Sequence, residues 1–216
     1  MTNEEYFINL EKIIHRYNEL RETGVSLAQD IIGQSLTKDD PFFCASLDRC
    51  LHLIDGIISM FRDRNLTCAG SLLRLQMDNC MRTYAAFIAK DKENVIDCLI
   101  YGTPIKNEFD INGKKMTDFH LKEAVAKLDP KFKQVYNQAS GYIHLSEKAF
   151  YQTVTDIDND GKLTLQVGHP LPEKRNEALL ECAEAFYHFV LLHYKMLNAV
   201  AESKKRFDKL QEKTQS

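Results

Sequence analysis

Five polar residues recur at four-residue steps within two segments that are otherwise rich in apolar residues. Arg74 and Asp78 lie in one segment, and Tyr136, Ser140 and His144 lie in the other. Residues four apart in an α-helix share one face, so each set predicts a polar ridge on a buried helix. Such groups could hold an anion or a nucleotide, with Arg74 as the anchor and His144 exchanging a proton near neutral pH.

Two explanations fit these ridges. In the first, two buried helices cross and satisfy each other's polar groups through an Arg–Asp pair and through hydrogen bonds from the tyrosine and the histidine. Buried charge is costly unless it is paired, which favours such a network. In the second, Arg74 and His144 face a ligand in a pocket. The two explanations differ in whether the side chains are sealed in the core or open to one cleft.

The spacing of apolar residues predicts a mainly all-α fold, a multi-helix bundle of about seven helices in a single domain over residues 1–216. The helix expected at 68–90 is apolar nearly all round, which indicates a central position. The charged tail at 204–216 is expected to fray, with Lys204 on a solvated face. Helical segments are expected at about 4–20, 25–36, 41–62, 68–90, 92–101, 117–128 and 130–145, and over about 30 residues after Pro172.

Late in the chain the period of the apolar residues changes to two, on both sides of an Asp-Asn-Asp-Gly turn. That pattern predicts one β-hairpin near residues 150–168. The same turn matches the first half of an EF-hand calcium loop through Asp156, Asp158 and Asp160, but position 12 is Val167 where a bidentate Glu is needed. The hairpin turn explains these residues without a metal, and weak calcium binding is the alternative.

The composition excludes several classes of protein. With 28 basic and 31 acidic residues, the net charge of −3 gives no general attraction to nucleic acid. No apolar run reaches the roughly 18 residues of a membrane-spanning helix, and no secretory leader is evident. The six cysteines form no C-x-x-C pair, so we expect reduced thiols in the cytoplasm and no membrane partner. Walker, H-E-x-x-H and G-x-S-x-G motifs are absent from the sequence, and no cofactor is expected.

The segments AGSLLRLQMDNCMRTYAAFIAKD and VYNQASGYIHLS resemble an uncharacterised bacterial all-helical family. Its members pair a Leu-Leu-Arg helix, usually with an acidic residue four positions on, with a Tyr-x-x-x-Ser-x-x-x-His helix. The resemblance covers roughly residues 40–150, and the matching positions are Arg74, Asp78, Tyr136, Ser140 and His144.

The arrangement is also distantly similar to the HEPN superfamily of helical ribonucleases and nucleotide-binding proteins. Those nucleases carry an arginine, four to six residues, and then a histidine on one helix. This chain contains no such spacing, and Arg74 lies on a different predicted helix from His144. The resemblance therefore implies a helical fold, while the nuclease motif itself is incomplete.

These observations favour a non-catalytic helical module that binds a partner or a small polar ligand, in a setting of stress or mobile-element defence. The first alternative is a metal-independent ribonuclease of HEPN type, with His144 as acid or base and Arg74 at the phosphate, for which RNA or a nucleotide would be the partner. The second is the weak calcium-binding module. Helical domains often dimerise through a long helix, so a homodimer is also open by analogy.

Overall fold

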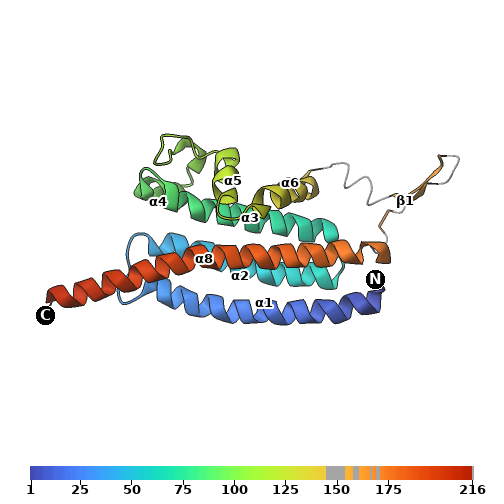
Figure 1. Ribbon diagram of the computed structural model, residues 1–216, viewed down its shortest axis with the longest axis horizontal. Coiled ribbons are helices and arrows are strands. Elements are labelled where there is room, and N and C mark those ends of the chain that lie inside the picture. Colours follow the sequence, from blue (N-terminus) through green and yellow to red (C-terminus); the bar gives the residue numbers. More distant parts are fainter. Residues whose placement is uncertain (145–153, 158–160, 166, 169–170, 216) are drawn as a thin grey trace.

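Four long helices form the body of the molecule, seen in a computed structural model that describes residues 1–144, 154–157, 161–165, 167–168 and 171–215. They are α1 (Asn3–Ile32), α2 (Asp40–Arg62), α3 (Leu66–Ile88) and α8 (Asn176–Gln215). Their most extensive contacts follow the cyclic order α1, α2, α3, α8, and α2 also touches α8. Figure 1 shows them side by side, with α2 running opposite to the other three. Their inner faces share one continuous apolar core.

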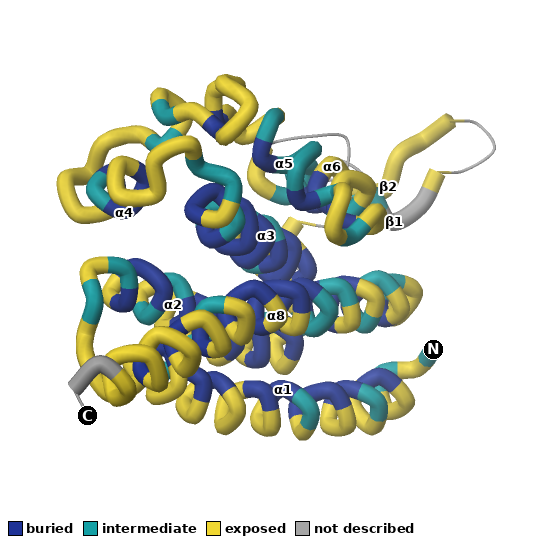
Figure 2. The backbone as a smooth tube through the Cα atoms, turned by 60° about the vertical axis from the view of Figure 1, so that its left-hand side comes forward, coloured by how far each residue is buried: buried dark blue, intermediate teal, exposed yellow. Residues whose placement is uncertain are grey.

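Three shorter helices cover the side of α3 that faces away from this bundle. They are α4 (Lys92–Tyr101), α5 (Asp118–Ala126) and α6 (Lys131–Ile143), with the 3-10 turn η1 (Ile105–Asn107) between the first two. Because α3 is covered on both sides, most of its length is buried in Figure 2. The prediction of a central helix in this part of the chain is confirmed.

The all-α class and the number of helices are confirmed, since the described residues contain seven α-helices. Strands β1 (Val154–Ile157) and β2 (Leu163–Leu165) pair antiparallel, with Ile157 opposite Leu163. The turn predicted between them, at residues 158–160, lies outside the described residues. None of the described helices is long and apolar enough to cross a membrane.

The alternative of a calcium loop falls on the same turn. Asp158, Asp160 and the side chain of Asp156 lie outside the described residues. Within the part of the chain that the structure describes, no group of three or more His, Cys, Asp or Glu side chains could hold a metal ion. Calcium binding by this segment therefore stays a prediction from the sequence.

The first helix differs from the sequence-based prediction, which broke it between residues 20 and 25. Helix α1 instead continues through Gly24 to Ile32. A Cβ atom at Gly24 would lie only 2.3 Å from the hydroxyl of Tyr194 and 2.7 Å from Leu51. The glycine is needed for the close approach of α8 and α2, and it does not end the helix.

Buried tyrosines tie the long helices together at carbonyl groups. The hydroxyl of Tyr6 donates to the carbonyl of Phe61 (2.7 Å), and that of Tyr17 donates to Ala183 (2.7 Å). From α8, the Tyr194 hydroxyl donates to Leu20 (2.8 Å). Burial raises the pKa of all three phenols. Each ring therefore fills apolar space while its hydroxyl is satisfied, as buried tyrosines require.

The C-terminal part of α8 also differs from expectation. The helix runs to Gln215, and Lys204 is buried where a solvated side chain was expected. The Lys204 ammonium lies 2.8 Å from the Asp40 carboxylate and also donates to the carbonyl of Ser35. Asp40 further accepts from the amide (2.7 Å) and hydroxyl (2.8 Å) of Thr37. This buried pair fastens α8 to the start of α2.

Replacing Lys204 by methionine should lower the free energy of unfolding by about 3–5 kcal/mol, because it leaves the Asp40 carboxylate buried without its cation. The control is Lys205→Met, which removes an ion pair to Asp30 whose two side chains are each 48% exposed. Exposed pairs contribute about 0–1 kcal/mol. Urea unfolding measures both variants. Equal losses of unfolding free energy would show that the buried pair stabilises the fold no more than the exposed one.

Candidate functional site

Arg74 contacts Tyr136, its predicted neighbour across the helix pair. Its guanidinium carbon lies 3.7 Å from the centre of the Tyr136 ring, and Nη2 donates to the phenol oxygen. The Arg74 side chain is only 13% exposed. Burial raises the pKa of Tyr136, although the nearby Arg74 opposes the rise. Arg74 therefore serves as the packing partner of α6 and is closed to a large ligand.

Asp78 is bound more closely by Arg82 than by Arg74. Its Oδ1 atom lies 3.3 Å from Nη2 of Arg82 and 4.0 Å from Nη1 of Arg74. The same Nη2 of Arg82 reaches Oδ1 of Asp118, the first residue of α5, at 2.5 Å. Arg74, Asp78, Arg82 and Asp118 thus form a linear chain of ion pairs whose formal charges cancel. The predicted charged stripe on α3 is real, and its partner is α5 as well as α6.

The remaining two predicted residues do not join Arg74. The Ser140 hydroxyl donates to the carbonyl of Tyr136 (2.8 Å), one helical turn before it. Helix α6 ends at Ile143, so His144 is an exposed cap residue with extended backbone (φ −104°, ψ 149°). The prediction that His144 continues the ridge is wrong, because the helix stops one residue too early. His144 lies eight positions after Tyr136, which corresponds to about 12 Å along the helix axis.

The close approach of α3 and α6 occurs at a glycine of α3. A Cβ atom at Gly70 would lie 2.4 Å from the ring of Tyr142. Ser71, beside it, donates to the carbonyl of Tyr142 (3.3 Å). The end of α6 that carries His144 therefore lies near the first turns of α3, away from Arg82 and Asp118.

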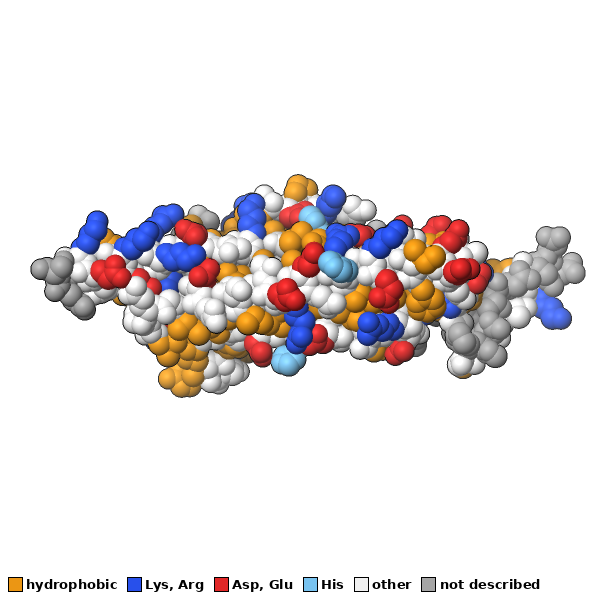
Figure 3. Space-filling view, turned by 90° about the horizontal axis from the view of Figure 1, so that it is seen from below, with side chains coloured by type: hydrophobic (Ala, Val, Ile, Leu, Met, Phe, Trp, Pro, Cys, Tyr) orange, Lys and Arg blue, Asp and Glu red, His pale blue; other side chains and the backbone are white. Residues whose placement is uncertain are grey.

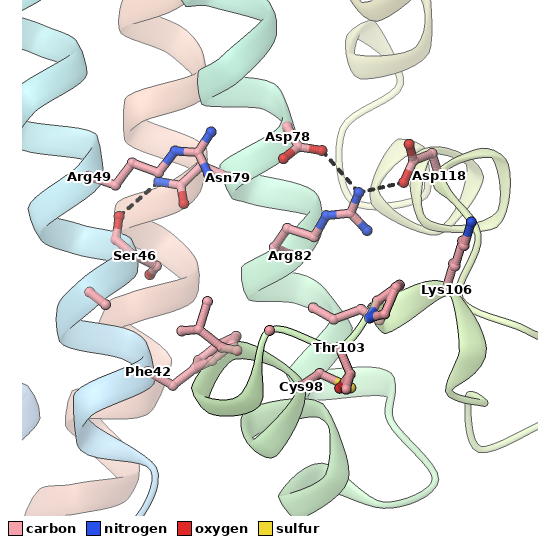
Figure 4. A pocket seen from close by; sticks show the side chains of 15 residues that line it. Phe42, Ser46, Arg49, Asp78, Asn79, Arg82, Cys98, Thr103, Lys106 and Asp118 are labelled. Carbon is pink, nitrogen blue, oxygen red and sulfur yellow. Dashed lines mark hydrogen bonds and ion pairs between the residues drawn. The ribbon is translucent and has the colours of Figure 1, made fainter.

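A pocket of about 530 Å³ opens beside the Arg82 network. Its walls come from α2, α3, the stretch from α4 to η1, and the start of α5 (Figure 4). Pockets of roughly 300–1,000 Å³ are typical of small-molecule sites. The residues that line it are Phe42, Ala45, Ser46, Arg49, Asp78, Asn79, Arg82, Cys98, Leu99, Gly102, Thr103, Pro104, Ile105, Lys106 and Asp118.

A row of buried polar groups lies behind the inner wall of the pocket. The Asn79 amide donates to the carbonyl of Ser46 (2.8 Å). Nε2 of His193, on α8, lies 3.2 Å from the Ser46 hydroxyl and 3.0 Å from that of Thr83. His193 is 0% exposed, and burial lowers its pKa from 6.5 to about 3. It is a neutral imidazole that joins α2, α3 and α8.

The pair of Ser46 and His193 has the composition of a nucleophile and its base, but not the required hydrogen bonds. The Ser46 hydroxyl donates to the carbonyl of Phe43 (3.0 Å) and not to Nε2 of His193, which lies 3.2 Å away and closer to the Thr83 hydroxyl (3.0 Å). An activated serine needs to donate to its base. Nδ1 of His193 has no partner among the described residues, so no carboxylate orients the ring. The pair is structural.

Sequence reasoning missed both the pocket and the buried row. A signal for the row was present, because Gln76, Asn79 and Thr83 stand at steps of three and four on the face of α3 that packs into the bundle. All three are buried, and the Gln76 amide donates to the carbonyl of Phe189 (3.4 Å). Nothing in the sequence indicates the pocket, because its walls come from four separate elements.

Stability should fall as the pH decreases from 7 to 5, because the unfolded chain binds a proton at His193 that the folded chain rejects. With a folded pKa of about 3 and an unfolded value of 6.5, this one site contributes a loss of roughly 2 kcal/mol over those two units. Urea unfolding at several pH values should show a flatter profile for His193→Gln. The exposed His52→Gln is the control, and identical profiles for H193Q and the parent would contradict the prediction.

Comparison of the chain with family models, with curated proteins and with solved structures finds no match. The side chains and distances described above are therefore the basis for any assignment of function. They give two distinct features: a closed network around Arg74 and Arg82, and an open pocket beside it.

Proposed function

We propose that this protein is a non-catalytic binding module whose ligand is a small polar molecule held in the pocket between α2, α3, η1 and α5. One observation carries the proposal: the pocket is large enough for a ligand, yet among the described residues its lining offers neither a histidine nor an unpaired carboxylate for proton transfer. No histidine lines it among the described residues, and both of its carboxylates are held by Arg82. Such a site can recognise and hold a molecule without transforming it.

The chemistry of the lining supports a ligand of mixed character. Hydroxyl and amide groups of Ser46, Asn79 and Thr103 provide polar contacts, as Figure 4 illustrates. Phe42 and Ile105 provide apolar surface in the same pocket. Binding sites typically combine an apolar lining with a few placed polar groups that fix orientation. The Arg82 network forms a rigid edge because each of its charges is already paired.

The ribonuclease alternative has less support. Arg74 is packed against Tyr136, and His144 is exposed at the far end of α6. A general acid and the group that stabilises phosphate charge must reach the same phosphate. Basic and acidic side chains are also interspersed over the face seen in Figure 3, which offers no broad basic field for RNA.

A substitution that fills the pocket should abolish ligand binding without unfolding the protein. Ala45 is an exposed residue of α2 that lines the pocket, so Ala45→Trp would place a large ring inside it. Fragment screening by ¹H–¹⁵N NMR should give hits that shift the amides of Asn79, Thr103 and Ile105 in the parent but not in A45W. Ser59→Phe, also exposed on α2 but outside the pocket, is the matched control. A screen without hits at these amides would contradict the proposal.

The two explanations of Arg74 predict opposite results for Arg74→Ala. As a packing residue, its loss strands the Tyr136 hydroxyl and should lower the free energy of unfolding by about 1–3 kcal/mol. The exposed His144→Ala should leave the free energy of unfolding within about 0.5 kcal/mol of that of the parent. We expect neither the parent nor either variant to cleave RNA. A fluorescent single-stranded RNA and urea unfolding provide the measurements. Cleavage by the parent that is lost in both R74A and H144A would establish the ribonuclease instead.

A further inference from the structure

The geometry points to a small organic dianion as the ligand of this pocket, a molecule with two separated anionic groups joined by an apolar linker. Arg49 would bind one anionic group and Lys106 the other. This inference rests on the proposed function, because it names the chemistry of the molecule that the same pocket receives. It follows from the charges of the lining, the positions of the two cations, and the apolar surface of the lining.

The charges that line the pocket do not balance. Five charged residues line it: three cations and two carboxylates. Arg82 pairs with both carboxylates, at 3.3 Å from Asp78 and 2.5 Å from Asp118. Arg74, which does not line the pocket, lies 4.0 Å from Asp78, so the network has two cations and two carboxylates. No ion pair joins Arg49 or Lys106 to any residue that the structure describes. The five lining charges sum to +1, and when Arg74 is counted four cations face two carboxylates, which leaves the two positive charges of Arg49 and Lys106 unpaired.

The two surplus cations come from different walls. Arg49 extends from α2 on one side of the pocket, and Lys106 rises from η1 on the other, with Arg82 between them in the view of Figure 4. A single phosphate or carboxylate group would neutralise only one of them. A molecule with an anionic group at each end would neutralise both, and arginine and lysine are the usual partners of such groups.

The apolar part of the pocket lining favours a ligand with an organic linker. Phe42, Leu99 and Ile105 contribute apolar side chains to the pocket. An apolar linker between the anionic groups would cover this surface, whereas two separate inorganic ions would leave it in water. The hydroxyl group of Thr103 can donate to an anionic end. Dicarboxylates and carboxylate-bearing phosphate esters share this pattern of charge and linker.

The test titrates the full chain with three probes, glutarate, adipate and pimelate, against the uncharged diamides of glutarate and adipate. Calorimetry gives the affinity, and NMR shifts at Asn79 and Thr103 locate the probe. We expect at least one dianion to bind in the pocket at least tenfold more tightly than a diamide. Its affinity should fall as salt rises from about 0.05 to 0.5 M, because screening weakens exposed charge pairs.

Arg49→Ala and Lys106→Ala should each weaken the dianion about tenfold, the loss of one charge-assisted contact. The matched controls are Arg62→Ala, an exposed arginine on the same helix, and Lys114→Ala, an exposed lysine in the chain between η1 and α5. Neither lines the pocket, so both should bind like the parent.

Three outcomes would overturn the inference: equal binding of diamides and dianions, binding of none of the three dianions, or losses in R62A and K114A as large as those in R49A and K106A. Neutral fragments that still shift the pocket amides would leave the proposed function standing while the dianion fails. Absence of any probe or fragment at these amides would refute both, so the two failures are distinguishable.

Discussion

The structure depends on one constraint: α3 is covered on both sides, so almost every polar group along it must find a partner inside the protein. Its inner face packs against α2 and α8, and its outer face against α5 and α6. An unpaired buried charge costs several kcal/mol, and an unsatisfied buried polar group costs about 1–3 kcal/mol. The other helices are placed where they meet these requirements as well as where they bury apolar surface.

The two faces of α3 meet the constraint by different means. On the outer face, Arg74 packs on Tyr136, and Arg82 binds the carboxylates of Asp78 and Asp118. On the inner face, uncharged groups pair with carbonyls and with the neutral imidazole of His193. Charge is kept where α5 brings an opposite charge, and neutral groups serve where only α2 and α8 are near. The network that resembled a catalytic site is therefore the seam that holds the outer helices.

The pocket arises where this covering of α3 is incomplete. Between the end of α4 and the start of α5 the chain passes through η1 and an extended loop, and a space remains against α2 and α3. Arg82 forms its rigid edge, while Arg49 and Lys106 line it without ion pairs to described residues. The seam and the candidate ligand site thus share a boundary. Asp78 therefore lines the pocket together with Arg82, whereas Arg74, Tyr136, Ser140 and His144 do not.

The sequence by itself determined the helices, the central place of α3 and the stripe of Arg74 and Asp78, because these follow from the spacing of residues along one helix. The sequence-based prediction was wrong at Gly24, where the helix continues because the glycine leaves room for α8. It was also wrong about the end of α6, which stops before His144.

Only the tertiary structure decided the partners of that stripe, the burial of Lys204 against Asp40, and the pocket with its two surplus cations. Each of these depends on side chains far apart in the chain, and on distances that no local pattern records.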